Sequence, residues 1–388
     1  MKLRVLHLGK FDDVGGIERH VRSLLRGLAA TGEVEPVNLV SNDSRRTDSH
    51  TEHGYLTVRA GCWGALASFA LSPSLPRLAL RLHRERRFDL VHLHFPDPLG
   101  QLVASLLPGG VRRVISWHSD IVRQRWALAL YQPLLTGFVR RADAIVAATP
   151  FHFAGSTQLP PPDGGPPRIV IPYGFEAREF QHTAASRARL EQLLAEKQAA
   201  GGRALFALGR HVYYKGFDVL LRAMARIDAI LWLGGSGPLT DELKATAERA
   251  GVAAKVRFVG RIPDDEPVAY YEAADVFVLP SVARAEAFGL VQLEAMYCRR
   301  PVVSSRLGTG VEWVNQDGVT GLVVPPGDAD ALAGAIDRLL ADAPLRAAMG
   351  EAGRQRVDRD FSTEQMVRRT LAVYRDLCGE PAAARAVA

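Results

Sequence analysis

The sequence has only three cysteines, no long apolar run and no Asp-x-Asp pair at the end of a predicted strand. Cys62, Cys298 and Cys378 are odd in number and far apart, which argues against a disulfide framework or a zinc cluster and fits a reducing cytoplasm. Arg, Gly or Pro interrupts the apolar runs well before the roughly 20 residues that a membrane-spanning helix needs. The opening residues MKLRVLHLGK carry charges inside their apolar run, so they predict a first β-strand and not a signal peptide.

Several catalytic motifs are also absent. The chain has no GxSxG, HExxH or Walker GK[ST] sequence, which disfavours serine hydrolases, zinc proteases and P-loop enzymes. The glycine pair in VGGIE does not match GxGxxG, which disfavours a dinucleotide fold. Since no Asp-x-Asp pair ends a predicted strand, we expect no metal site for Mn²⁺ or Mg²⁺ and no bound cofactor.

The remaining sequence is typical of a globular α/β protein. Its 388 residues, 47% apolar and 23% charged, suffice for two domains. Short continuous apolar runs alternate with longer helical patterns, and such runs predict strands buried on both faces of parallel sheets. We therefore expect two Rossmann-like, doubly wound parallel-sheet domains that face each other across a cleft. Strands are expected at 3–8, 34–40, 90–94, 114–117, 144–148, 169–171, 205–208, 230–233, 256–259, 276–279 and 301–304. Helices are expected at 16–30, 75–87, 97–107, 124–141 and 184–199.

The domain boundaries follow from composition. We expect one domain over 1–175, a second over 176–360, and a linker near 172–182, after a loop rich in proline and glycine. The last segment, 361–388, predicts a capped helix followed by a frayed tail.

The strongest chemical signal is EAFGLVQLE, which runs from Glu286 to Glu294 after the strand predicted at 276–279. Gly289 is expected to open a helix whose backbone N–H groups can bind an anion or a sugar hydroxyl. Glu294, inside that helix, can accept hydrogen bonds from both hydroxyls of a ribose, and Glu286 can accept from a sugar. The alternative is that both glutamates are surface residues of a capped helix.

A second signal is GRHVYYKGFD, in which Arg210 and Lys215 lie five residues apart in a predicted strand-to-helix loop. Both side chains can reach one diphosphate and offset the charge that grows on a leaving nucleoside diphosphate, a role that metal ions play in other transferases. The alternative is a pair of solvated basic side chains.

Two glycine loops and one histidine are further candidates for binding. Gly15 and Gly16 follow the first strand, and Gly235 lies in GGSGP, where glycine lets the backbone approach a ligand closely. His118 directly follows the strand predicted at 114–117, and ligands of doubly wound sheets bind at such strand ends. The alternative is that it is a plain core or surface residue. His92 and His94 alternate along another strand, and we expect them to belong to its two faces.

Taken in order, GGIE, His118, GRHVYYKG, GGSGP, SVARAEAFGLVQLEAM, PVVSS and TGLVVPPGD resemble the motifs of the retaining glycosyltransferases of family four. The resemblance covers nearly the whole chain and implies their GT-B fold. It is closest to bacterial mannosyl- and rhamnosyltransferases of surface-polysaccharide assembly.

The resemblance implies a role for each matching residue. Arg210 and Lys215 match the diphosphate-binding pair. Glu286 matches the contact to the donor sugar, which His118 also touches, and Glu294 matches the contact to the ribose. The family's backbone N–H donors correspond to Phe288, Gly289 and Leu290. The loop that approaches the diphosphate corresponds to Gly15 and Gly16.

The activity so implied is a metal-independent, retaining hexosyl transfer from a nucleotide sugar, with GDP-mannose the first expected donor and a UDP-sugar the second. Residues 1–175 would bind a glycan or polyprenyl-diphosphate-linked acceptor, 176–360 the donor, and the terminal helix would cross back to the first domain. Nucleic acid is not an expected partner. The alternatives are an epimerase or sugar-phosphate synthase of the same fold, and a non-catalytic nucleotide-sugar-binding protein that need not keep Arg210 with Lys215.

The net charge of +6 lies wholly within residues 1–180, which contain 22 Lys and Arg against 16 Asp and Glu. Two segments of that half, 75–87 and 123–141, mix Arg with Leu and predict helices that lie on an anionic membrane surface. Such docking would make the protein cytoplasmic and peripheral to the inner face of the membrane. The alternatives are leucine faces buried against the domain's own sheet and arginines that are merely solvated.

Overall fold

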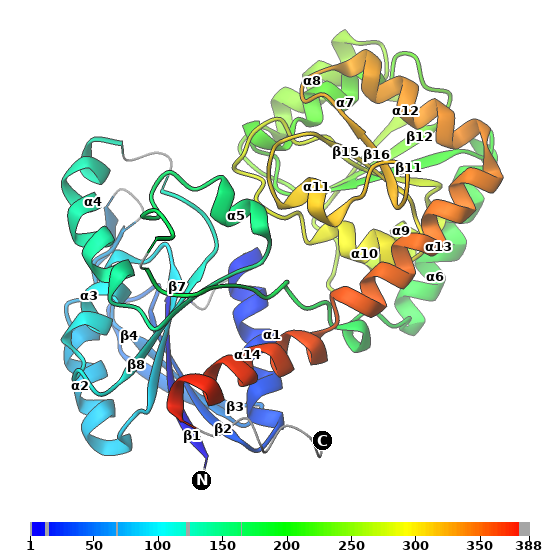
Figure 1. The fold of residues 1–388 in the computed structure, drawn as a ribbon. Coiled ribbons are helices and arrows are strands. Elements are labelled where there is room, and N and C mark those ends of the chain that lie inside the picture. Colours follow the sequence, from blue (N-terminus) through cyan, green and yellow to red (C-terminus); the bar gives the residue numbers. More distant parts are fainter. Residues whose placement is uncertain (1, 12–14, 67–68, 122–124, 164, 380–388) are drawn as a thin grey trace. The chain divides into compact units, whose positions relative to one another are not determined.

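A computed structural model of the chain describes residues 2–11, 15–66, 69–121, 125–163 and 165–379 (Figure 1). The chain divides into two compact units. The N-terminal unit comprises Met1–Gly174 and Thr363–Ala388, and the C-terminal unit comprises Phe175–Ser362. Each unit is built on its own sheet, as the alternation of apolar strands and helices predicts. The frayed tail predicted after the last helix lies outside the described residues.

The N-terminal unit contains an eight-stranded sheet with the order β10-β9-β8-β7-β1-β2-β4-β3. The chain starts in the middle of this sheet, moves outward to one edge and then returns to the other side of β1, so the strand order reverses between β1 and β7. The strands are β1 Leu3–Phe11, β2 Val34–Ser41, β3 Asp48–Glu52, β4 Tyr55–Ala60, β7 Leu90–Phe95, β8 Arg112–Trp117, β9 Ala144–Ala147 and β10 Arg168–Val170. A separate two-stranded ribbon consists of β5 Ala65–Leu66 and β6 Phe69–Ala70.

Two strands at one edge of this sheet, β3 and β4, were not expected from the sequence. β3 pairs antiparallel with β4, and the turn between them contains His53 and Gly54, both with positive φ. β3 reads DSHTE and is largely exposed, so it lacks the apolar run that reveals a buried strand.

Helices cover both faces of the N-terminal sheet (Figure 1). On one face Val5 belongs to a buried cluster with Leu24 of α1 and Leu371 of α14. On the other face Leu6 packs with α2 and α3, because successive residues of a strand point to opposite faces. The helices of this unit are α1 Gly16–Ala30, α2 Leu75–Arg86, α3 Pro98–Leu106, α4 Arg125–Arg140, α5 Pro150–Ala154 and α14 Thr363–Cys378.

The leucine face of α2 lies in this core. Leu75, Ala79 and Leu82 are at most 8% exposed and pack against the sheet. The prediction that this helix presents its apolar face to a membrane is therefore wrong, because the unit's own sheet already covers that face. In the second arginine-rich segment, Leu135 is buried in the same core. Among the described residues, no helix is long and apolar enough to cross a bilayer.

The C-terminal unit contains a six-stranded parallel sheet with the order β13-β12-β11-β14-β15-β16. Its strands are β11 Ala204–Leu208, β12 Ile230–Gly234, β13 Val256–Gly260, β14 Val276–Leu279, β15 Val302–Ser305 and β16 Gly321–Val324. Its helices are η1 Ala177–Glu179, α6 Ala184–Ala199, η2 Tyr213–Lys215, α7 Phe217–Ala223, α8 Thr240–Arg249, η3 Ala253–Lys255, α9 Pro267–Ala273, α10 Val291–Tyr297, α11 Gly310–Val314, α12 Ala329–Ala341 and α13 Ala343–Asp360.

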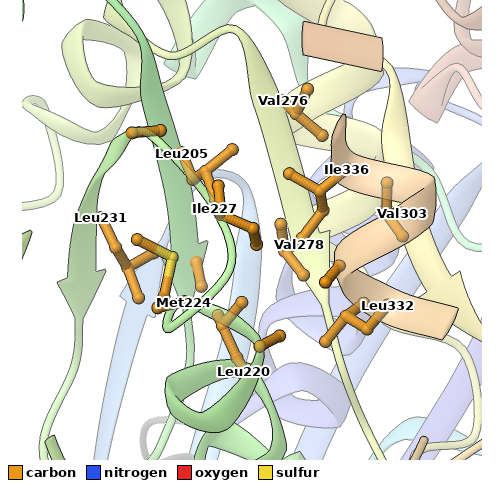
Figure 2. Packing of buried hydrophobic residues seen from close by; sticks show 14 of the residues in the cluster. Leu205, Leu220, Met224, Ile227, Leu231, Val276, Val278, Val303, Leu332 and Ile336 are labelled. Carbon is orange, nitrogen blue, oxygen red and sulfur yellow. The ribbon is translucent and has the colours of Figure 1, made fainter. Parts of the chain in front are cut away.

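The core of the C-terminal unit holds the central strands in place. Figure 2 shows Leu205, Val276 and Val303 of neighbouring strands gathered against Leu220 of α7 and Ile336 of α12. Each of these side chains is fully buried, and such burial contributes roughly 1.5–3 kcal/mol per side chain relative to exposure. The core therefore fixes where β11 and β14 end and where their loops begin.

The strand order of this sheet reverses between β11 and β14. Ligands of open α/β sheets bind outside the carboxyl ends of the strands at such a reversal. The loop after β11 contains Arg210 and Lys215, and the loop after β14 contains Glu286. In the N-terminal unit, Gly15 and Asp97 follow the two strands that flank the corresponding reversal.

Candidate active site

Lys215 lies at the end of the loop that joins β11 to α7. Gly216 directly after it has φ +65°, and a Cβ there would lie 2.1 Å from the carbonyl oxygen of Pro280, so only glycine fits this close approach. The loop brings Lys215 Nζ within 2.5 Å of Glu286 Oε2, to which it donates a hydrogen bond. Lys215 and Glu286 are 9% and 7% exposed, so this is a buried ion pair.

The neighbouring loops hold Glu286 in place. Ser281 Oγ donates to the same carboxylate oxygen at 3.0 Å, and Thr309 Oγ1 donates to the Glu286 carbonyl oxygen at 2.9 Å. Thr309 comes from the loop after β15, so residues from three strand ends hold Glu286, two of them at its carboxylate and one at its backbone. Its position is set by tertiary contacts and not by its own loop alone.

Arg210 lies near this ion pair and is exposed. Burial raises the pKa of the Tyr214 hydroxyl, while Lys215 and Arg210 oppose that shift and Glu286 adds to it. All three charged groups are therefore within electrostatic range of one tyrosine. No described residue forms an ion pair with Arg210, so its guanidinium is available to an anionic ligand.

Glu294 lies in α10 and is 5% exposed. It accepts a hydrogen bond of 2.8 Å from the hydroxyl of Tyr271. The helix begins at Val291, two residues later than expected, with Leu290 as the residue before it. Gly289 has φ +72°, and a Cβ there would lie 2.7 Å from Leu279 Cδ2, which explains the glycine at this turn.

Phe288 and Gly235 help to pack the loops of this site. Phe288 is 3% exposed and packs edge-on against Phe361. Gly235 has φ +105°, and a Cβ there would lie 2.0 Å from the carbonyl oxygen of Gly209. The loops after β11 and β12 therefore meet backbone to backbone, as the GGSGP motif suggests.

The arrangement provides two cationic groups and two carboxylates at the carboxyl ends of adjacent strands. Cations placed in this way can stabilise charge on a leaving diphosphate, and buried carboxylates can orient sugar hydroxyls. This is the chemistry expected of a nucleotide-sugar site.

Comparison with known proteins identifies the family of this chain. Residues 192–356 match the family "Glycosyl transferases group 1", and residues 14–153 match "Glycosyltransferase Family 4". The chain is 30% identical over 380 residues to O-antigen chain mannosyltransferase C of Escherichia coli, which covers 97% of this chain and 99% of that protein. The chain is a family 4 glycosyltransferase.

Two further comparisons extend this result. The transferase is 36% identical over 327 residues to D-rhamnosyltransferase WbpZ of Pseudomonas aeruginosa, covering 84% of this chain and 83% of that protein. Its structure resembles sucrose-phosphate synthase from Thermosynechococcus elongatus, with a TM-score of 0.79, 25% identity, and coverage of 97% of this chain and 99% of that chain. The transferase therefore has the GT-B fold, and its relatives act in the synthesis of polysaccharides and glycolipids.

Gly15, Gly16 and His118 belong to the N-terminal unit. Gly16 is the first residue of α1, and Gly15 precedes it in an extended conformation. A Cβ on Gly15 would lie 2.1 Å from Glu18 Oε2. Val14, the first residue of VGGIE, lies outside the described residues. The proposed contact of these glycines with a diphosphate stays a prediction.

His118 of the transferase is buried among hydrogen-bonding rings and is 3% exposed. Its Nδ1 lies 2.6 Å from the Tyr173 hydroxyl, and its Nε2 lies 3.1 Å from His94 Nδ1. Both ring nitrogens are thus occupied, so contact with a donor sugar requires one of these partners to be exchanged. That contact also stays a prediction.

His92 and His94 lie on the same face of β7, and the expectation that they belong to two faces is wrong. Residues two apart in a strand share a face. Their rings stack with centroids 4.6 Å apart, and His92 Nδ1 lies 2.5 Å from the hydroxyl of Tyr374 in α14.

Asp97 is a candidate that sequence reasoning missed. It follows β7, precedes α3 and is 5% exposed. Burial raises its pKa to about 6, against the opposing effects of backbone hydrogen bonds and of Lys10. Carboxyl groups with such a shift are common at functional sites. Its place at the start of the helix predicted at 97–107, just after the strand predicted at 90–94, was the signal that could have identified it.

The structure contains one Asp-x-Asp pair after a strand, β16, that was not predicted from the sequence. Asp328 and Asp330 follow that strand. Asp328 accepts from the Ala331 N–H and caps α12, and Asp330 forms an exposed ion pair with Arg226. Both carboxylates have structural partners.

The buried ion pair predicts a stability defect. Lys215→Met leaves the Glu286 carboxylate buried without its cation, so we expect a loss of about 3–5 kcal/mol in the free energy of unfolding. Glu286→Gln in the same chain removes the unpaired charge and should recover most of that loss. Urea unfolding of the two single variants and the double variant measures this coupling. Additive losses in the double variant would show that the pair does not stabilise the fold.

The buried histidines predict that stability falls in acid. Burial lowers the pKa of His7 and His20 from 6.5 to about 3. Burial also lowers the pKa of His92, His94 and His118 well below 6.5. Neighbouring histidines add to this effect at every one of these sites except His20. The unfolded chain takes up protons near 6.5, but the folded chain does not until far lower pH. Stability should therefore decrease below pH 6.5 by about 1.4 kcal/mol per pH unit for each histidine that stays neutral. Asp97 opposes this trend with a single group.

Amide hydrogen exchange at about pH 7.5 and about pH 5.5, corrected for intrinsic rates, tests this expectation. Protection in the core of the N-terminal unit should fall at the lower pH by more than protection in the C-terminal unit, which serves as an internal control. Equal changes in both units would contradict the assignment of the effect to these histidines.

Proposed function

We propose that this transferase moves mannose from GDP-mannose, with retention of configuration and without a metal, to a glycan or polyprenyl-diphosphate-linked glycan of a bacterial surface polysaccharide. The observation that carries the proposal is the buried Lys215–Glu286 pair beside the exposed Arg210, at the strand reversal of the C-terminal sheet. A protein that only senses nucleotide sugars would not need two cationic groups to offset the charge of a leaving group.

The proposed reaction breaks the bond between the anomeric carbon and the diphosphate oxygen and forms a bond to the acceptor oxygen on the same face. The acceptor proton passes to the departing phosphate, so no protein base is required. Arg210 and Lys215 offset the charge that grows on the diphosphate. Glu286 orients the hydroxyls of the donor sugar, and Glu294 binds the ribose.

The choice of donor rests on the names of relatives. One relative is a mannosyltransferase, and another, 38% identical over 362 residues, is described as GDP-mannose-dependent and comes from Mycolicibacterium smegmatis. A D-rhamnosyl donor is the second candidate, favoured by the 36% identity to WbpZ. A UDP-sugar remains the alternative outside this group.

A panel of sugar nucleotides tests the donor. GDP-mannose at about 100 times its dissociation constant should stabilise the fold by about 2.7 kcal/mol, more than GDP-rhamnose, UDP-glucose or dTDP-rhamnose at equal concentration. Release of GDP from GDP-mannose should be equally fast in excess EDTA and in Mg²⁺, and NMR of the product should show a retained anomeric configuration. Stabilisation by UDP-glucose alone, or a need for divalent metal that salt cannot replace, would refute the proposal.

Arg210→Ala should separate catalysis from stability. Its guanidinium is exposed, so the free energy of unfolding should stay within about 0.5 kcal/mol of the wild type. Loss of one charge-stabilising group should lower kcat for GDP release by about 10²–10³-fold, with a smaller change in KM. Arg203→Ala is the matched control, because this exposed arginine lies at the opposite end of β11. A kcat near the wild-type value in Arg210→Ala would remove Arg210 from the mechanism.

A further inference from the structure

A continuous chain of hydrogen bonds runs through the N-terminal unit on the face that α1 and α14 cover. It joins side chains from β1, β7 and β8, the residue after β8, the segment before the unit boundary, and α14. In order along the chain of hydrogen bonds, the members are Tyr173, His118, His94, His7, Tyr374, His92 and Ser116. The donor–acceptor distances between successive members are 2.6, 3.1, 3.1, 3.4, 2.5 and 2.7 Å.

The contacts between imidazoles restrict where their protons can be. His94 meets His118 through Nδ1 and His7 through Nε2, and each of these contacts joins two ring nitrogens. A neutral imidazole has one N–H donor and one acceptor nitrogen, so in each contact one ring must donate and the other accept. It follows that His7, His94 and His118 must all carry the proton on the same type of nitrogen.

Only two arrangements of His7, His94 and His118 satisfy these contacts with neutral rings. In the first, all three rings carry Nε2–H: Tyr173 donates to His118, and the direction continues through His94 and His7 to Tyr374. In the second, all three carry Nδ1–H and each of these bonds points the other way, so that His118 donates to Tyr173. The hydroxyls of the two tyrosines can donate or accept and therefore fit both directions.

The rings are in the right charge state for such a chain. All members are at most 6% exposed, and burial lowers the pKa of every histidine in it. His20 of α1 packs against Tyr173 and His118, and burial lowers its pKa too. No carboxylate of the described residues hydrogen-bonds to these rings, so nothing nearby favours an imidazolium.

We propose that this chain is a two-state tautomer array in which Tyr374 and His7 decide whether His118 donates or accepts through Nδ1. Tyr374 acts as a positioning residue through His7 and His94. The consequence for sugar recognition rests on the proposed function. A hydroxyl of the sugar nucleotide that takes the place of the Tyr173 hydroxyl would meet His118 Nδ1 as a hydrogen-bond acceptor in the first state and as an N–H donor in the second.

The two ends of the chain should shift the tautomers in opposite directions. Tyr374→Phe removes the acceptor for His7 Nε2–H, so the first arrangement would leave a buried N–H unpaired and the second should be favoured. Tyr173→Phe removes the acceptor for His118 Nδ1–H and should favour the first. An unpaired buried donor is costly enough to change the tautomer ratio about fivefold or more. Tyr131→Phe is the matched control, since Tyr131 bonds to Gln101 in the same unit and not to the chain.

NMR of the full chain labelled with ¹⁵N in histidine reports the tautomer of each ring and needs neither donor nor turnover. We expect His7, His94 and His118 to have the same ratio of the two tautomers in the wild type, and that ratio to be unchanged in Tyr131→Phe. The three rings should favour Nδ1–H in Tyr374→Phe and Nε2–H in Tyr173→Phe. Different tautomer ratios among the three rings, or the same ratio for His118 in Tyr374→Phe and in Tyr173→Phe, would overturn the proposal. The KM for GDP-mannose in Tyr374→Phe tests the link to sugar recognition separately.

A metal ion is the competing use of these rings. Nitrogens of His7, His92 and His94 lie within 4.8 Å of one another, close enough to converge on one ion. Their present hydrogen bonds, and the absence of a bonded carboxylate among the described residues, favour the neutral chain. Zn²⁺ titrated into EDTA-treated protein should bind weakly and leave the ¹⁵N shifts of these rings unchanged. Stoichiometric binding that shifts all three rings would replace the array with a metal site.

Discussion

The buried ion pair between Lys215 and Glu286 is the interaction on which the C-terminal site depends. Removing two charges from water is costly, so the pair is stable only if its geometry is good and other groups satisfy the remaining lone pairs. Ser281 supplies such a group at the carboxylate, and Thr309 fixes the Glu286 backbone. Gly216 and Gly235 let the loops approach closely enough for this contact. The ion pair also keeps the ammonium group ordered, so a diphosphate would meet a lysine already in position.

The two sheets carry different kinds of polar side chain near their reversals of strand order. Each has a reversal of strand order, and each places polar side chains at the carboxyl ends of the central strands. The C-terminal unit places opposite charges there and balances them. The N-terminal unit places histidines there and keeps them neutral, because burial makes an imidazolium unfavourable. A row of neutral, hydrogen-bonded rings has a direction but no net charge, which would suit the proposed contact of His118 with a sugar hydroxyl.

Much of the fold could be predicted from the sequence. The helices expected at 16–30 and 184–199 are α1 and α6 with the same bounds, and the expected strands all occur. Errors arose where the local pattern carries little information. β3 is polar, the leucines of α2 were assigned to a membrane although the sheet covers them, and two histidines of one strand were assigned to opposite faces. Asp97 was overlooked because a single carboxylate has no spacing pattern that reveals it.

The sequence by itself determined the α/β class, the strand-to-helix loops and the residue types in them, because periodicity and glycine-rich turns are short-range properties of the chain. It also placed Arg210, Lys215, Glu286 and Glu294 in such loops or just beyond them. Only the tertiary structure decided their partners. Lys215 meets Glu286 across 71 residues and His92 meets Tyr374 across 282, contacts that arise from strand order and helix packing. The position of these side chains and the lowered pKa of His92 depend on burial and on residues distant in the sequence, and no local pattern encodes either.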